Sequence, residues 1–389
     1  MDFQYHVPTR IIFGPGKLNE LHEQQFPGKK ALIVISAGQS AKANGYLARV
    51  QKELDEAGIS YAIFDKVQSN PIDRNVMEGV ALAKAEKCDF TIGLGGGSCL
   101  DTAKAIAFMV PNQGDLWDYM DSGSGKGLPA TNPPLPIVAI NTTSGTGSEV
   151  GPWFVTSKEA TYEKLGFGGP ELFPLFSIVD PELMLTVPPN FTAYQGFDVL
   201  FHAVEGYVGK AAYPISELYS LNVIELISSY LPMAVADGSD LGAREKVALA
   251  DIMAGMVDAT AACTSEHSLQ HALSAYAPAL PHGAGLIMIS KAYYQHLAEN
   301  HACDEKMIQM AKAMGKIDAT KAMDFVTTLD CLQEACGVSD LKMSDYGLKK
   351  EDARIYAENA RNNCGILFQF DPIEISDDDC VTILEKSYK

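Results

Sequence analysis

The sequence predicts an α/β domain with a parallel sheet, followed by an all-helical domain. In the first half, short apolar runs alternate with helical patterns, which is typical of strands joined by crossover helices. After Val187-Pro188-Pro189, β-branched runs give way to long helical patterns. The chain has 389 residues, more than one hydrophobic core usually covers. We therefore expect two domains, comprising residues 1–187 and residues 188–389.

Strands and helices alternate in the first domain at the spacing of βαβ units. The first strand, Arg10–Phe13, ends in a Gly/Pro turn, and a helix is expected from Lys17. Further strands are expected at residues 31–36, 60–65, 89–94, 135–140 and 175–180, with helices at 46–57 and 76–87. Such alternation implies a parallel sheet that helices cover on both faces.

A glycine-rich turn follows the strand expected at residues 89–94. It contains Gly95, Gly96, Gly97 and Ser98, and a helix opens near Asp101. Glycines let the backbone approach a phosphate, and the helix N-terminus supplies free N–H groups. Ordinary tight turns also use glycine runs, but the strand before and the helix after favour phosphate binding. We therefore expect a Rossmann-like domain in which this turn binds a phosphate group.

A second polar loop, residues 141–149, follows the strand expected at 135–140. It includes Thr142 and Thr143 and is rich in hydroxyls and glycines. Such a loop can line the phosphates or ribose of a cofactor. The same composition is equally typical of a flexible loop that binds no cofactor.

The second domain reads as a series of helices with little strand character. They are expected at residues 192–208, 215–229, 243–261, 265–275, 284–299, 305–314, 319–335, 350–361 and 376–388. Small-molecule sites are common between domains, so we expect a cleft with a cofactor on one wall and the helical domain on the other.

Four of the eight histidines fall between residues 197 and 283. Asp198 and His202 are four residues apart, and so are His267 and His271, which places each pair on one helix face. Either pair alone arises by chance in many helices. Here the flanking segments are apolar, so these groups are expected to be buried and to need partners or a metal. His282 from the following turn could complete such a site, and a set of imidazoles with a carboxylate suits iron, zinc or nickel.

Bulk composition excludes some classes of partner. The chain carries 30 basic and 49 acidic residues, a net charge of −19, which argues against binding nucleic acid or an anionic membrane surface. The N-terminus lacks a secretory pattern, and no apolar run is long enough to cross a bilayer. The eight cysteines are scattered, as in reduced cytoplasmic proteins.

Several motifs in order resemble one known family over almost the whole chain. They are Phe13-Gly-x-Gly16, Asn70-Pro71, GGGSCLDTAKAIA (95–107), TTSGTGSE (142–149), GFDVLFHAVEGYV (196–208) and Pro281-His-Gly283. The family is the iron-containing, group III alcohol dehydrogenases, whose fold is dehydroquinate synthase-like. The resemblance implies that the metal ligands are Asp198, His202, His267 and His282, with His271 as a non-liganding histidine near the substrate. It also implies that Asn70, Asp101, Thr142, Thr143, Lys164 and the Gly95–Ser98 turn contact a nicotinamide dinucleotide.

The chain departs from the family pattern after the strand at residues 31–36. Many members carry an aspartate there, which accepts hydrogen bonds from the ribose of NAD and repels a 2′-phosphate. Here the sequence is Ser36-Ala-Gly38-Gln39-Ser40, with no acid. Ser36, Gly38 and Ser40 leave room for a phosphate, so we favour NADP(H), with NAD(H) as the alternative.

The resemblance implies hydride transfer between a small primary alcohol or diol and its aldehyde, with a divalent ion, iron first, as Lewis acid. Ser148, Trp153, Phe154, Tyr194 and Tyr276 are candidates for the substrate pocket or, equally, for the core. A homodimer or larger homo-oligomer is expected. The alternatives are a zinc-dependent polyol dehydrogenase, a non-redox enzyme of the same fold, a metal hydrolase without a dinucleotide, and a structural protein with a vestigial site.

Overall fold

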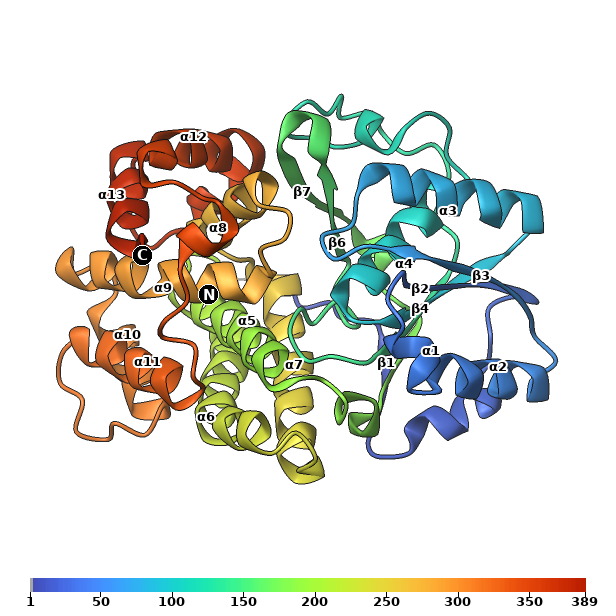
Figure 1. Ribbon diagram of the computed structural model, residues 1–389, viewed down its shortest axis with the longest axis horizontal. Coiled ribbons are helices and arrows are strands. Elements are labelled where there is room, and N and C mark those ends of the chain that lie inside the picture. The colour runs from blue at the N-terminus through green and yellow to red at the C-terminus, as the bar shows by residue number, and fades with distance from the viewer. Residues whose placement is uncertain (1–2) are drawn as a thin grey trace.

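The computed structural model describes residues 3–389, and its two halves lie side by side (Figure 1). Strands β1–β8 all precede residue 180, and helices α5–α13 follow from Pro189. A parallel sheet followed by a helical half confirms the predicted fold class. The division into domains at residues 187 and 188 remains a prediction.

The first half is built on six parallel strands in the order β1-β8-β5-β4-β2-β3. Their bounds are β1 Arg10–Phe13, β2 Lys30–Ser36, β3 Ser60–Val67, β4 Phe90–Gly95, β5 Ile137–Asn141 and β8 Phe176–Val179. The central strands β4, β5 and β8 are buried at every residue because both faces are covered. Parallel pairing places the carboxyl ends of β2, β4 and β5 next to one another at one edge of the sheet.

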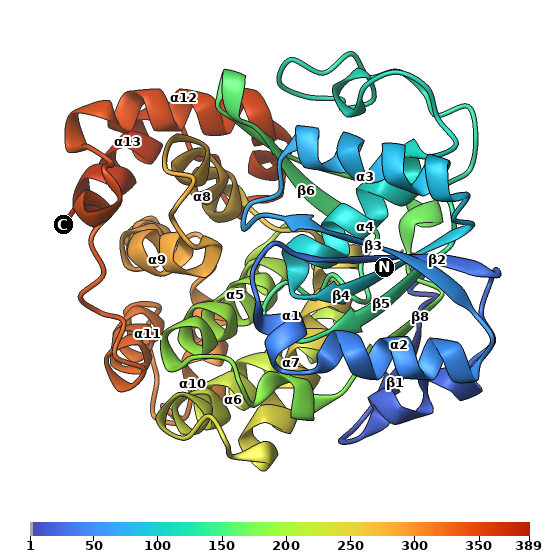
Figure 2. The ribbon, with the colours of Figure 1, turned by 45° about the vertical axis from the view of Figure 1, so that its right-hand side comes forward.

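Helices cover the two faces of this sheet (Figure 2). On one face lie α3 (Asp73–Glu86) and α4 (Gly97–Met109), which pack on the side chains of Leu32 and Val34. The other face carries α2 (Tyr46–Glu56), which packs on the intervening residues of β2. Alternate side chains of one strand therefore enter two separate cores, as the period of a strand requires.

The structure differs from the sequence expectations in three places. The segment at Lys17–Glu23 is a 3₁₀ helix rather than an α-helix, and a short, unpredicted helix, α1 (Ser40–Ala43), begins at the end of the segment Ser36–Ser40. The sequence interpretation also missed an antiparallel hairpin, β6 (Trp153–Lys158) and β7 (Glu163–Gly168). This hairpin is held by packing, because Phe154, Leu165 and Phe167 join the core around α4.

The second half is helical and is organised around α5. The helices are α5 Pro189–Val208, α6 Pro214–Ala236, α7 Leu241–Ala261, α8 Ser265–Tyr276, α9 His282–Glu299, α10 Asp304–Ala313, α11 Met323–Ala335, α12 Ala353–Cys364 and α13 Asp377–Ser387. Two glycines on α5 let its neighbours approach. A Cβ at Gly196 would lie 2.2 Å from Leu231 of α6, and one at Gly206 would lie 2.2 Å from Val257 of α7.

Helix α6 is long and apolar enough to cross a membrane by composition alone, with a mean hydropathy of 1.3 over 18 residues. Its buried side chains, however, join the common core of the helical half. Val223, Ile224, Ile227 and Leu231 are all fully buried there. An apolar helix that supplies one face to a core has the same composition as a spanning helix, so its hydropathy is explained by packing.

Candidate metal centre

Three helices bring an aspartate and three histidines to one point inside the helical half. Asp198 and His202 lie one turn apart on α5, His267 lies on α8, and His282 is the first residue of α9. Asp198 Oδ1 lies 3.5 Å from His267 Nε2, 3.4 Å from His282 Nε2 and 3.9 Å from His202 Nδ1. The four residues predicted as metal ligands are therefore neighbours in space.

Several of these ligand atoms are buried without a hydrogen-bond partner. They are Asp198 Oδ1, His202 Nδ1 and His267 Nε2, in residues that are 3%, 6% and 4% exposed. A buried polar atom with no partner costs about 1–3 kcal/mol. A divalent cation among them would engage all three atoms, and nitrogen with carboxylate oxygen suits iron, zinc or nickel. The residues present thus fit a metal ion.

Two further side chains, absent from the sequence predictions, fix the imidazole rings. His267 Nδ1 donates to Glu205 Oε1, and His282 Nδ1 donates to Gln270 Oε1. Each bond leaves the lone pair of Nε2 directed at Asp198, as metal-binding histidines require. Sequence spacing did not reveal either partner, because Glu205 lies near His202 in the chain but bonds His267, and Gln270 lies near His267 but bonds His282.

The chain turn before α9 places His282. A Cβ at Gly283 would lie 1.9 Å from the backbone oxygen of Tyr194 on α5, so only glycine permits this approach. The first turn of α9 therefore rests directly on the backbone of α5. This contact sets His282 beside Asp198, which lies one turn further along α5.

His271 lies one turn beyond His267 on α8 and is 8% exposed. Its Nδ1 is 3.5 Å from the thiol of Cys364, and Nε2 has no hydrogen-bond partner among residues 3–389. Burial, followed by the nearby Lys164 ammonium, lowers the pKa of His271 well below its ordinary value. Burial therefore favours a neutral imidazole at this position.

The residues predicted to contact a dinucleotide lie at the carboxyl ends of neighbouring parallel strands. The Gly95–Ser98 turn follows β4, Thr142 and Thr143 follow β5, and Ser36 ends β2. The two loops touch closely. A Cβ at Gly96 would lie 2.8 Å from Thr143, and one at Gly97 would lie 2.5 Å from Thr146. This edge of a parallel sheet is where α/β folds bind ligands.

Asn70 and Lys164 join this edge to the helical half. Lys164 Nζ donates to Asn70 Oδ1 at 2.9 Å, and Asn70 Nδ2 donates to the backbone oxygen of Pro278 at 3.0 Å. Burial lowers the pKa of Lys164 to about 8. Asp101, by contrast, faces inward, because its two oxygens accept from Ser148 Oγ and Val155 N. Of the predicted cofactor contacts, Asp101 is therefore the one that the arrangement favours least.

Comparison with known proteins identifies the family. The sequence model described as "Iron-containing alcohol dehydrogenase" matches residues 8–181, and that of the "Fe-containing alcohol dehydrogenase family, C-terminal" matches residues 192–388. The chain belongs to the iron-containing alcohol dehydrogenase family. It is therefore an oxidoreductase of that family, as the sequence resemblance implied.

Other members of the iron-containing alcohol dehydrogenase family match over most of their length. The NAD-dependent methanol dehydrogenase of Bacillus methanolicus is 34% identical over 368 residues, 92% of each chain. The 1,3-propanediol dehydrogenase of Klebsiella pneumoniae is 36% identical over 370 residues, again 92% of each chain. Among solved structures, an archaeal halo-thermophilic Red Sea brine pool alcohol dehydrogenase is 33% identical with a TM-score of 0.93, covering 100% of this chain and 99% of that one.

For this iron-containing alcohol dehydrogenase, the candidate substrate-pocket residues divide into two groups. Phe154 is fully buried in the core around α4, and Ser148 is buried against Asp101 and Lys104, so neither is free to line a pocket. Trp153 is 42% exposed, and Tyr194 is half-buried. Tyr276 is also half-buried and stacks on Tyr162 with ring centroids 4.6 Å apart.

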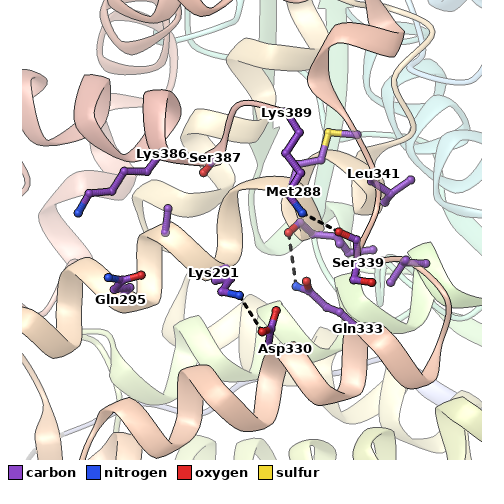
Figure 3. A pocket seen from close by; sticks show the side chains of 13 residues that line it. Met288, Lys291, Gln295, Asp330, Gln333, Ser339, Leu341, Lys386, Ser387 and Lys389 are labelled. Carbon is purple, nitrogen blue, oxygen red and sulfur yellow. Dashed lines mark hydrogen bonds and ion pairs between the residues drawn. The ribbon is translucent and has the colours of Figure 1, made fainter.

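A separate cavity of about 290 Å³ lies between α9, α11 and α13 (Figure 3). Its polar side chains already have partners. Lys291 pairs with Asp330 at 2.7 Å, and Lys389 Nζ donates to the backbone oxygen of Ser339 at 2.7 Å. None of the predicted site residues lines this cavity.

Proposed function

We propose that the chain is a divalent-metal, NAD(P)-dependent alcohol dehydrogenase, or aldehyde reductase, that interconverts small primary alcohols or diols and aldehydes. Iron is the favoured ion, with zinc or nickel as alternatives. The observation that carries the proposal is the convergence of three unpartnered, buried ligand atoms on Asp198, His202 and His267. His282 would complete the set. Family membership supports the reaction class.

When bound, the metal ion would act as a Lewis acid toward the substrate oxygen, and a nicotinamide would exchange hydride with the substrate carbon. The protein's own contribution is to hold these groups and exclude water. Asp198 supplies the one negative charge among the four ligands. Glu205 and Gln270 keep His267 and His282 in the tautomer that presents Nε2.

His271 is the proposed proton carrier. Its depressed pKa keeps the imidazole neutral, so Nε2 is able to accept a proton from an alcohol hydroxyl. The proposed role of Lys164 is to position a cofactor through Asn70, since its ammonium is already bonded there. The buried ammonium also disfavours a second positive charge on His271, which speeds the loss of the accepted proton.

We propose NADP(H) as the cofactor, with NAD(H) as the alternative. Support comes from residues 37–40, which are exposed and carry no acid, beside half-buried Ser36. On the neighbouring strand, Asp65 is paired with Lys42 at 2.6 Å. A test is Ala37→Asp, which restores an acid after β2. It should raise the KM for NADPH roughly tenfold or more through charge repulsion, with little effect on NADH.

Ala43→Asp, also an exposed position near this loop, is the matched control and should leave both KM values unchanged. A wild-type enzyme that uses NADH alone contradicts the NADP(H) proposal. The methanol dehydrogenase relative is named as NAD-dependent, which is why NADH belongs in the same assay.

The alternative functions within this fold are a zinc-dependent polyol dehydrogenase and a non-redox metal enzyme. We also propose that the protein is cytoplasmic, which its eight free cysteines support. A homodimer or larger homo-oligomer is proposed from the family resemblance. Light scattering of the purified protein tests the oligomeric state.

The first experiment is reconstitution of metal-free protein with Fe²⁺, Zn²⁺ or Ni²⁺ under anaerobic conditions. Each preparation is then assayed with a panel of small aldehydes and either NADPH or NADH. Metal-dependent loss of the reduced-nicotinamide absorbance is the expected result. His267→Ala should remove both metal content and activity. If the variant keeps both, the ligand assignment is wrong. Metal and cofactor binding without reduction of any aldehyde favours the non-redox alternative.

A further inference from the structure

Cys263 lies beside two of the proposed metal ligands. The ligand atoms of His202, Cys263 and His267 all lie within 4.8 Å of one another, and all three residues are buried. Asp198, His267 and His282 form a second group with the same spacing. His267 thus belongs to two groups that differ in donor chemistry, one containing a carboxylate and the other a thiol.

The backbone holds Cys263 firmly in this position. Ala262, between α7 and α8, has a φ of 57° and a ψ of 163°, a sparsely populated conformation that costs a non-glycine residue about 1–3 kcal/mol. Thr264, on the other side, donates from both N and Oγ1 to Glu205 Oε2 at 2.6 and 2.7 Å. The thiol therefore sits between a strained turn and an anchored residue, with Asp258 Oδ1 3.2 Å from Sγ.

His267 has a single lone pair to offer. Its Nδ1 is bonded to Glu205, so only Nε2 is available for an ion, and Nε2 has no other partner. His202 Nδ1 is likewise buried and unpartnered. A neutral imidazole nitrogen binds one ion at a time, so an ion held with Cys263 and an ion held with Asp198 would compete for His267.

We propose that His202, Cys263 and His267 form a second, thiolate-containing metal position that takes a soft divalent ion such as Zn²⁺. The inference rests on the metal centre proposed above, whose carboxylate and imidazole set suits Fe²⁺. Thiolate and imidazole together are preferred ligands of zinc, which also accepts three protein ligands with water as the fourth. The identity of the ion then decides which of the two groups holds it.

Binding exchanges the S–H bond of Cys263 for a bond from sulfur to the ion, and the released proton passes to solvent. Neither sulfur nor the ion changes oxidation state. Asp258 Oδ1, which accepts a hydrogen bond from Cys263 Sγ at 3.2 Å, would be the first acceptor of that proton.

The test is X-ray absorption at the zinc edge of Zn²⁺-reconstituted full-length protein. The wild type should show a sulfur neighbour at about 2.3 Å. Cys263→Ser should lose that neighbour, while Cys364→Ser, a matched buried thiol beside His271, should retain it. Fe²⁺-loaded wild type, measured at the iron edge, should show nitrogen and oxygen only.

A competition measurement adds a second readout that is independent of activity. Cys263→Ser should lower the ratio of Zn²⁺ to Fe²⁺ affinity at least tenfold. Zinc bound by nitrogen and oxygen alone in the wild type overturns the thiolate position but leaves the proposed function standing. Sulfur that persists in Cys263→Ser also overturns it. A wild type that binds no metal contradicts the metal centre itself, and with it both proposals.

Discussion

At the scale of single residues, the proposed metal site depends on side chains that orient the metal-binding residues without binding the ion themselves. Glu205 accepts from His267 Nδ1 and from two groups of Thr264, so one carboxylate fixes both a ring and the backbone that precedes α8. Such partners orient a metal-binding histidine and raise its basicity.

Glu205→Gln should therefore weaken metal binding without removing a ligand. The amide keeps the shape of the side chain but loses the charge, and we expect metal affinity to fall roughly 10–100-fold. Chelator competition on the reconstituted protein measures this. Glu299→Gln, a surface acid, is the control and should change nothing. Unchanged affinity in Glu205→Gln would show that the carboxylate does not tune the ring.

The buried His271 predicts a pH dependence of stability in the metal-free protein. Because burial lowers the folded-state pKa, the unfolded chain takes up this proton first as pH falls. Stability should then decline below about pH 6.5, by up to about 1.4 kcal/mol per pH unit from this group. His271→Gln should flatten that decline in urea unfolding. An identical decline in the variant would mean that His271 is already charged when folded.

At the scale of elements, the start of α9 is tied to α5 by a glycine. Gly283→Ala should force the first turn of α9 away from Tyr194 and carry His282 with it. We expect a loss of about 1–3 kcal/mol of stability, together with weaker metal binding. Denaturant midpoints and metal content measure the two effects.

Gly365→Ala is the matched control, since no heavy atom lies within 4 Å of the added Cβ. It should leave both quantities unchanged. Equal effects of the two substitutions would show that the contact with Tyr194 does not position His282.

Elements with a strong local pattern were predictable from the sequence, and those held by distant contacts were not. Strand β2 has a clear apolar run, and the helices carrying Asp198 and His267 have clear helical patterns. On those helices, residues four apart share one face, which is why the pairs Asp198/His202 and His267/His271 could be recognised. The hairpin strand β7 contains two glycines and two charges, and it is stabilised by packing against α4. Gln270 gave no signal of its own, because an amide in an apolar helix fits many roles until its ring partner is located.

At the scale of the whole molecule, a buried acid pair joins the two halves. Asn141 Nδ2 donates to Glu149 Oε2 at 2.9 Å and to Asp251 Oδ2 on α7 at 3.2 Å. Burial raises the pKa of Glu149 to about 7. The folded protein thus retains a proton that the unfolded chain releases near pH 4.5, and stability from this group falls as pH rises between the two values.

Glu149→Gln should remove this pH dependence. The neutral amide needs no proton, so the variant should be more stable than the wild type at pH 8, on the order of 1–3 kcal/mol. At pH 5 the two should be similar. Thermal unfolding at both pH values tests this, and a variant that is less stable at pH 8 would show that the ionised pair supports the junction.

The position of the ligands along the chain has a consequence for biosynthesis. Asp198, His202, His267 and His282 are all translated by residue 282 of 389. Asp371, which anchors the start of α8, and α12, which packs against α8, lie later in the chain. A nascent chain therefore contains its complete ligand set before the covering helix α12 has been made. Metal supply during translation, rather than exchange in the finished enzyme, would then decide which ion is enclosed.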